Sequence, residues 1–176
     1  PMIAKLITWG PTRDEAADLQ IAALDRFEIE GLGHNIDFVS AIMQHPRFRS
    51  GEITTGFIAE EYPDGFHGAA STPELIKSLA AIAGFVATAE ADRARHVDGQ
   101  LGDTLDPPSS WQVKIGDAVH DIEMVDGDIR VDGEPFDLSM EYDSGDRLIE
   151  AEIGDEELAV KILKTRIGFK LTTRGA

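Results

Sequence analysis

The apolar residues between Leu79 and Ala91 occupy almost every face of a helix predicted over residues 73–97. Only Thr88 and Glu90 place larger polar groups within this run. A surface helix has one apolar stripe, whereas a helix that is apolar all round must be enclosed by protein or lipid. Because the run is shorter than the roughly 20 residues of a membrane span, we expect the rest of the chain to enclose this helix.

Both ends of this central helix carry recognisable capping signals. Ser71 and Glu74 have capping-box spacing, and Pro73 would lie in the first turn, where its missing N–H is not needed. Gly99 is placed to end the helix in a left-handed conformation. Cations that suit the negative end of the helix dipole fall in the predicted last turns: Arg93, Arg95 and His96.

The chain before the central helix combines one strand pattern with helical periodicity. Residues 2–9 form an apolar run that predicts a strand, ended by a Gly-Pro pair. Thr12 and Glu15 predict the capped start of a helix that runs to about Phe27. The residues on the apolar face of that helix are Ala17, Ile21 and Leu24.

Two further helices are predicted before residue 68. Asn35 is placed to cap a helix over 36–45, which Pro46 would stop. Its expected inward residues are Ile36, Val39 and Met43. Residues 54–62 predict a short last helix, and the segment 68–70 predicts a domain boundary.

From Trp111 onwards the apolar period changes from 3.6 to 2. Alternating runs separated by tight turns predict about seven antiparallel strands. The turn signals are Gly116-Asp117, Asp126-Gly127, Asp132-Gly133, 143–146 and Gly154-Asp155. A meander with one apolar face curls into a sandwich or barrel, so the pattern favours a barrel wrapped around the apolar helix.

Charge and composition exclude several classes of function. The chain has 16 Lys and Arg against 33 Asp and Glu, a net charge of −17. Binding to phosphate needs clustered Lys and Arg, so the composition argues against nucleic acids and against anionic membranes. The chain has no cysteine, which leaves no disulfide or thiolate chemistry. No signal peptide or membrane span is visible, which makes a cytoplasmic-type compartment the expectation.

Candidate catalytic and metal-binding groups do not form a recognisable site. None of the five histidines has a partner at metal-ligand spacing, and His120 is expected to face solvent. Residues 125–133 resemble a calcium loop but fit two hairpin turns better. Carboxylate pairs such as Glu60-Glu61 lie at helix ends, where they are solvated rather than held in the apolar setting of a catalytic acid.

Several segments resemble the carboxy-terminal end of a biotin carboxylase domain. They are PMIAKL at 1–6, the helix start at 10–16, GHNI at 33–36 and the stretch 48–57. The sequence YPDGF at 62–66 resembles the alpha subunits of propionyl-CoA carboxylases in particular. The remaining chain resembles the BT domain of those subunits, which joins the biotin carboxylase to its carboxyltransferase partner, so the resemblance covers essentially the whole chain.

The resemblance implies a parent ligase. In that family, ATP and bicarbonate carboxylate biotin, and the carboxyltransferase beta subunit passes the carboxyl group to propionyl-CoA. The family's catalytic residues correspond to positions before Pro1, and its biotin-attachment motif to positions after Ala176. The resemblance therefore implies a non-catalytic assembly fragment that binds no cofactor and no metal itself, from a parent that uses biotin, ATP and Mg²⁺.

The resemblance also implies two sites. In the family the neighbourhood of Thr55 approaches the adenine pocket, which makes Thr55 a peripheral contact to ATP. A hook loop between helix and barrel grips the carboxyltransferase subunit, and residues 98–110 fit that loop by position. Its apolar contacts would be Leu101, Leu105, Pro107 and Pro108. Judged from the residues alone, an ordinary surface loop is equally compatible with this stretch.

The combined expectation is an α+β chain. Residues 1–68 would be the α/β tail of a biotin carboxylase C-terminal domain. Residues 69–176 would be a BT domain, an antiparallel β-barrel wrapped around a long central helix and lacking its last strand, which leaves an exposed edge. The expected partners are the carboxyltransferase beta subunit and the biotin carboxylase and biotin carrier domains of the same subunit.

Three alternatives remain open. A methylcrotonyl-CoA or related acyl-CoA carboxylase subunit is disfavoured by YPDGF. A free-standing barrel for a small apolar ligand is disfavoured because Ile82, Phe85 and Val86 would fill its lumen. A separate enzyme that uses surface carboxylates would need a convergent polar pocket. The family places the parent in the cytoplasm of a bacterium or in the mitochondrial matrix of a eukaryote.

Overall fold

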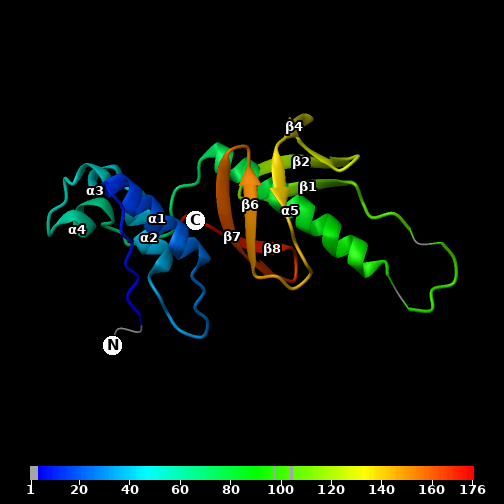
Figure 1. Cartoon of the computed structure of the whole chain (residues 1–176), viewed down its shortest axis with the longest axis horizontal. Helices are drawn as coiled ribbons and strands as arrows, with labels where there is room; N and C mark the ends of the chain where they lie inside the picture. The colour runs from blue at the N-terminus through cyan, green and yellow to red at the C-terminus, as the bar shows by residue number, and fades with distance from the viewer. Residues whose placement is uncertain (1–3, 97, 104) are drawn as a thin grey trace. The chain divides into compact units, whose positions relative to one another are not determined.

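A computed structural model describes residues 4–96, 98–103 and 105–176 (Figure 1). These residues form two compact units. The first unit combines the chain up to Ala70 with Ala159–Lys161 and Thr172–Ala176. The second unit comprises Ser71–Leu158 and Ile162–Leu171. The chain therefore leaves the first unit twice and returns to it twice.

The first unit is helical. Its helices are α1 (Arg13–Arg26), α2 (Ile36–Gln44), α3 (Pro46–Ser50) and α4 (Phe57–Glu61). The Thr12 hydroxyl accepts the Glu15 backbone N–H at 3.2 Å, which confirms the predicted start of α1. The predicted apolar face of α1 is buried as expected: Ala17, Ile21 and Leu24.

Three details around α2 differ from the prediction. The Asn35 side chain makes no capping bond; instead the Ile36 N–H donates to His34 Nδ1 at 3.4 Å. The buried residues are Ile36, Ser40 and Ala41, so the buried face is rotated from the expected one. Pro46 does not only stop α2 but begins α3, because a proline at the first helical position loses no hydrogen bond.

The predicted strand over residues 2–9 is wrong for its described part, residues 4–9, and residues 2–3 lie outside the described chain. A strand needs a hydrogen-bonded neighbour, and no strand of the described residues pairs with this segment. Ile7 and Trp9 are instead 77% and 80% exposed. The Thr8 hydroxyl lies 2.9 Å from the carbonyl oxygen of Ala16 and ties the segment to α1.

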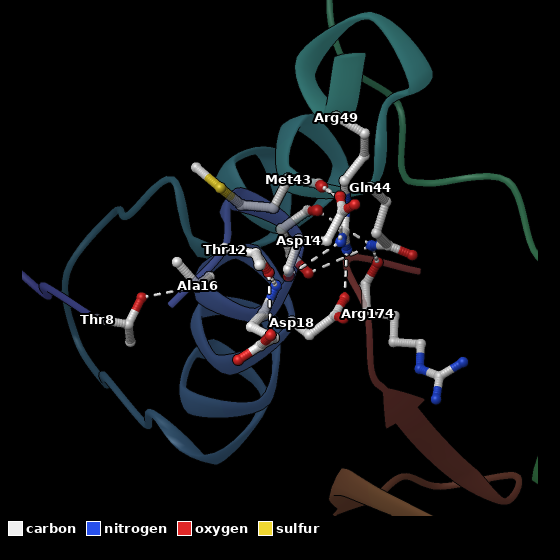
Figure 2. A network of polar contacts seen from close by, with 11 residues as sticks. Thr8, Thr12, Asp14, Ala16, Asp18, Met43, Gln44, Arg49 and Arg174 are labelled. Carbon is white, nitrogen blue, oxygen red and sulfur yellow. Dashed lines mark hydrogen bonds and ion pairs between the residues drawn. The ribbon is translucent and has the colours of Figure 1, made fainter. Parts of the chain in front are cut away.

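A guanidinium network joins α1 and α2 to α3 (Figure 2). Arg49 donates from Nε to the carbonyl oxygen of Met43 at 2.7 Å and pairs from Nη2 with Asp18 at 2.5 Å. Arg13 donates to the carbonyl oxygen of Phe48 at 2.7 Å. Arginine is suited to this role because its planar fork binds several acceptors at once.

The second unit contains the long helix α5 (Pro73–Ala94). Its N-cap is Thr72 rather than the predicted Ser71, because Pro73 occupies the first helical position and the cap is the residue before it. The helix ends at Ala94, before the predicted Gly99, and Val97 lies outside the described residues. Its buried residues cover every face, as predicted: Ser78, Leu79, Ala80, Ala81, Ile82, Gly84 and Val86.

The described residues form eight strands rather than about seven. They are β1 (Ser110–Ile115), β2 (Ala118–Val125), β3 (Asp128–Val131), β4 (Glu134–Phe136), β5 (Leu138–Met140), β6 (Leu148–Ile153), β7 (Glu156–Lys164) and β8 (Phe169–Thr172). The predicted period of two and the predicted turns are confirmed. Asp126 and Asp132 have positive φ angles of 53° and 55°, as hairpin turns of the primed types require.

The strands form two four-stranded sheets, in the orders β1-β2-β3-β4 and β5-β6-β7-β8, and they do not close into a barrel within the described chain. The mixture of helices and antiparallel sheets agrees with the expected α+β class. The run between the predicted turns at Asp132-Gly133 and 143–146 divides at Asp137 into β4 and β5, which belong to different sheets. The two sheets are therefore not continuous at this point, as the predicted closed barrel would require.

The core of the second unit lies between α5 and the first sheet. Figure 1 shows α5, in green, running along β1 and β2. The buried residues of this core are Ala80, Ala81, Ile122, Ile129 and Val131. A Cβ atom added to Gly84 would lie 2.6 Å from Cγ2 of Ile122, so the absence of a side chain lets the helix approach the sheet.

The prediction that His120 faces solvent is wrong. His120 shares the inward face of β2 with Ile122, and its side chain is 17% exposed. Its Nδ1 lies 2.8 Å from Oδ2 of Asp132. The bond from His120 holds the pKa of the Asp132 carboxyl below its usual range. A polar residue at an inward strand position thus finds a carboxylate at a hairpin turn, which strand alternation alone does not reveal.

We predict that Gly84→Ala destabilises the second unit. Overpacking of a core costs about 1–3 kcal/mol, which exceeds the gain of at most about 1 kcal/mol in helix propensity. The measurement is urea unfolding followed by circular dichroism. Gly33→Ala is the matched control, because a Cβ at Gly33 meets no atom within 4 Å. Equal stability of Gly84→Ala and wild type would contradict the close packing against Ile122.

Candidate functional site

The segment between α5 and β1 exposes the apolar residues predicted for a partner interface. Leu101 is fully exposed and Leu105 is 78% exposed. Pro108 is exposed and Pro107 is half-buried. Figure 1 shows the described parts of this segment, 98–103 and 105–109, extending away from the sheets of the second unit. Large apolar side chains on an extended loop have no role in the core, so they are available for contact with another surface.

Arg95 fixes the base of this segment. It follows the last residue of α5, and its Nη2 pairs with Oδ1 of Asp92 at 2.5 Å. Its Nη1 donates to the carbonyl oxygen of Leu105 at 2.6 Å. At the other end of the segment, the Met124 N–H donates to the carbonyl oxygen of Ser109 at 2.7 Å. The loop is therefore held at both ends, and the sequence reasoning missed this role of Arg95 because it depends on a contact across ten residues.

Glu90 anchors the second half of α5. The Tyr142 hydroxyl donates to Glu90 Oε1 at 3.0 Å, and Lys164 forms an ion pair with Oε2. The Lys164 ammonium, together with the hydroxyls of Ser144 and Tyr142, lowers the pKa of Glu90 to about 2. The carboxylate is therefore ionised at neutral pH, and it joins α5 to the stretch between β5 and β6 and to the last residue of β7.

Thr88 is the other polar residue within the apolar run. Its hydroxyl accepts a hydrogen bond from Nε1 of Trp111 at 2.8 Å and donates to the carbonyl oxygen of Gly84 at 3.0 Å. A buried indole N–H needs an acceptor, and Thr88 supplies it. Both polar interruptions of the helix thus have partners in the second unit.

Thr55 lies in the first unit, on the exposed turn between α3 and α4. The neighbouring Thr54 hydroxyl accepts the Gly56 N–H at 3.1 Å and shapes this turn. Thr55 thus belongs to the first unit, whereas the exposed leucines belong to the second.

The first unit also contains a pocket of about 650 Å³ that the sequence reasoning missed. It is lined mainly by apolar side chains, with polar groups from Gln20, His34 and Asn35. Its apolar walls come from the N-terminal segment, α1, α2 and the connection between these two helices: Ala4, Leu6, Leu24, Phe27, Ile29, Ile36 and Val39. No periodicity in the sequence indicates this pocket, because its walls come from several separate segments.

The described residues also bear on metal binding and on membrane insertion. Among the described residues, no three His, Cys, Asp or Glu side chains gather in a way that could hold a metal ion. Within the same part of the chain, no helix has the length and hydropathy needed to cross a membrane.

The chain matches two known families of protein domains. Residues 79–176 match the family described as the propionyl-coenzyme A carboxylase BT domain. The chain belongs to this family. Residues 1–60, which precede the BT domain, match the biotin carboxylase C-terminal domain family. Both matches confirm the resemblance that the sequence segments indicated.

Relatives of the BT-domain chain carry consistent names. A propionyl-CoA carboxylase alpha chain from Ruegeria pomeroyi is 41% identical over 187 residues, which cover 100% of this chain and 27% of the relative. The human mitochondrial propionyl-CoA carboxylase alpha chain is 31% identical over 180 residues, covering 98% of this chain and 25% of the relative. The chain thus spans about a quarter of the length of these relatives.

A methylcrotonoyl-CoA carboxylase subunit alpha from Dictyostelium discoideum is similar over a shorter stretch. It is 47% identical over 58 residues, which cover 33% of this chain and 8% of the relative. The stretch is shorter than the BT-domain match of 79–176 alone. The similarity to propionyl-CoA carboxylase alpha chains is therefore the more extensive one.

We predict that Glu90→Gln destabilises the BT-domain chain at neutral pH by about 1.5–3 kcal/mol, the range for hydrogen bonds to charged groups. The folded-state pKa of Glu90 lies below its ordinary value of 4.5. Its contribution is therefore present above about pH 4.5 and is lost as the pH falls towards 2. Thermal unfolding between pH 3 and 7 should show the difference from wild type shrinking with acidification.

The matched control is Glu123→Gln, which changes an exposed carboxylate of β2. It should unfold like wild type across this range. An equal loss in both variants would show that net charge, rather than the contacts of Glu90, determines the effect.

Proposed function

We propose that this chain is the assembly part of a propionyl-CoA carboxylase alpha subunit and that it binds the carboxyltransferase beta subunit. The observation that carries the proposal is the loop with exposed Leu101 and Leu105, which Arg95 holds at its base. Membership of the BT-domain family and the names of the relatives support the same role. In this role the chain catalyses no step.

The proposed interface uses few but suitable groups. Leu101 and Leu105 would insert into apolar depressions of the partner, with Pro107 and Pro108 restricting the backbone between them and β1. Truncation of a few central apolar residues usually removes most of the binding energy of an interface. Because the base of the loop is held by Arg95, less conformational entropy is lost when the loop binds.

The parent enzyme would carboxylate biotin with ATP and bicarbonate and transfer the carboxyl group to propionyl-CoA. Biotin, ATP and Mg²⁺ would be its cofactors, with Thr55 as a peripheral contact to the adenine of ATP. The exposed position of Thr55 is compatible with this contact. A scaffold that binds both active-site bodies raises the effective concentration of carboxybiotin at the second site.

We also propose the finer organisation of the chain. Residues 1–68 would belong to the biotin carboxylase domain and residues 69–176 to the assembly domain, with both sheets arranged around α5. Burial of α5 on every face and the contacts of Glu90 with Tyr142 and Lys164 support this arrangement. The relatives include a bacterial protein and mitochondrial proteins, so either the bacterial cytoplasm or the mitochondrial matrix would suit the parent.

We predict that Leu101→Asp combined with Leu105→Asp weakens binding to a propionyl-CoA carboxylase beta subunit at least about tenfold, or about 1.4 kcal/mol. Each carboxylate would have to be desolvated in an apolar contact. Light scattering of the mixture at moderate salt, followed by titration calorimetry, measures the complex and its affinity.

The control for charge is Val119→Asp combined with Ile167→Asp, which adds the same two carboxylates at exposed apolar positions outside the loop. This control should bind like wild type. Failure of the folded wild-type chain to bind the beta subunit, or equal binding by the loop variant, would refute the proposed interface.

A further inference from the structure

The end of the last strand is held by the helices of the first unit. Thr172–Ala176 and Ala159–Lys161 group with residues up to Ala70, although more than 80 residues separate them in the sequence. Side-chain and main-chain bonds must therefore maintain this grouping. We call the contacts of residues 172–176 with α1 and α2 the C-terminal attachment.

Asp25 lies at the centre of the C-terminal attachment. It occupies the last turn of α1 and is 5% exposed. Its Oδ1 accepts the backbone N–H of Arg174 at 2.7 Å, and its Oδ2 lies 3.4 Å from the hydroxyl oxygen of Thr173. That hydroxyl also lies 2.8 Å from the carbonyl oxygen of Ala159. One buried carboxyl thus contacts two consecutive residues that follow β8.

These contacts determine where the protons can lie. The Thr173 hydroxyl has one proton, and the carbonyl oxygen of Ala159 can only accept a hydrogen bond. The contact of this hydroxyl with Ala159 is the shorter one, and a hydroxyl that donates there can accept a hydrogen bond from a protonated carboxyl at Asp25. Burial has the largest effect on the pKa of Asp25 and raises it, whereas the Arg174 N–H, the Thr173 hydroxyl and the charges of Lys161 and Arg174 lower it. The raised pKa therefore results from burial, and a neutral carboxyl is compatible with the contacts.

Main-chain bonds complete the attachment. Gln44 of α2 donates from Nε2 to the carbonyl oxygen of Arg174 at 2.6 Å (Figure 2). The Ala69 N–H donates to the carbonyl oxygen of Gly175 at 2.8 Å. Gly175 has a φ angle of +80°, and a Cβ there would overlap the carbonyl oxygen of Asp37. The last residues are therefore fitted closely to α2.

The short piece of β7 in the first unit contacts the same end of α1. Lys161 donates from Nζ to the carbonyl oxygens of Leu24 and Phe27, at 3.3 and 3.5 Å. A cation suits these positions because the carbonyl groups at a helix C-terminus carry partial negative charge. Ala159 is buried on the same strand.

We propose that Asp25 is a positioning residue that holds residues 172–176, at the end of the BT-family match, against the helices of the biotin carboxylase match. This role rests on the proposed function. It gives the assembly domain a second, non-covalent attachment to the carboxylase side, in addition to the covalent connection through residues 62–72. Asparagine should replace Asp25, because its amide can accept from Arg174 and donate to Thr173 as a neutral carboxyl does.

The test compares hydrogen exchange of the backbone amides of Arg174 and Ala176 in four variants of the full chain. Asp25→Ala should accelerate exchange about tenfold or more. Local opening of residues 172–176 then no longer has to break the bonds to Asp25, so it costs less free energy. Asp25→Asn should stay within about threefold of wild type. Asp18→Asn is the control on the same helix, since Asp18 pairs with Arg49 outside the attachment. Gln44→Ala should accelerate exchange without disturbing Asp25, and it remains informative if Asp25→Ala does not fold.

The pH dependence separates positioning by the neutral carboxyl from general loss of packing. A folded-state pKa above the ordinary value gives stability that is present at low pH and lost as the pH rises through that pKa. The protection of the Arg174 backbone amide against hydrogen exchange should therefore fall with rising pH in wild type. In Asp25→Asn, which has no titrating carboxyl at this position, the protection should not change with pH. Wild-type protection in Asp25→Ala would overturn the proposal, and so would wild-type protection in Gln44→Ala if Asp25→Ala does not fold.

Binding to the beta subunit, measured on the same samples, separates the two proposals. Asp25→Ala should bind the beta subunit like wild type, because the attachment and the exposed loop belong to different units. If wild type fails to bind while the exchange pattern holds, the proposed interface is refuted but the attachment stands. If binding is normal and exchange does not respond to Asp25, only the attachment is refuted.

Discussion

The second unit depends on burying α5 on every side between Ser78 and Val86. An enclosed helix has no solvent-facing side that can accommodate large side chains. Small residues are therefore needed at the positions where the helix lies closest to the sheet. Ala80, Ala81 and Gly84 serve this purpose, and Ile122 of β2 fills the space that a side chain on Gly84 would occupy. The close packing of protein interiors makes such a contact sensitive to a single methyl group.

The second half of α5 satisfies a different constraint. Thr88 and Glu90 are polar, and an unpaired polar group in the interior is costly. The indole of Trp111 and the groups around Glu90 remove that cost and fix the helix along its length. The helix therefore ends at a defined place, where Arg95 connects it to the loop that carries the exposed leucines. The stability of the core and the position of the loop are consequences of the same helix.

Local patterns in the sequence predicted the parts of the fold that local physics determines. The cap at Thr12, the all-round burial of α5 and the hairpin turns at Asp126 and Asp132 follow from nearest neighbours and periodicity. Two further predictions failed where a partner distant in sequence decides the outcome. The N-terminal segment lacks a neighbouring strand within the described residues, and His120 faces inward because Asp132 is available to it.

The candidate sites follow the same division. The exposed leucines could be located by position in the sequence, because an irregular stretch between a helix and a sheet is a local feature. The role of Arg95 and the position of Asp25 could not, since both depend on tertiary contacts. In the sequence, nothing distinguishes Asp25 from the many other carboxylates of this acidic chain. Only its burial in the structure separates it from Asp18 on the same helix. In a protein with so many carboxylates, the informative one is the carboxylate that water does not reach, because placing it there requires specific donors around it.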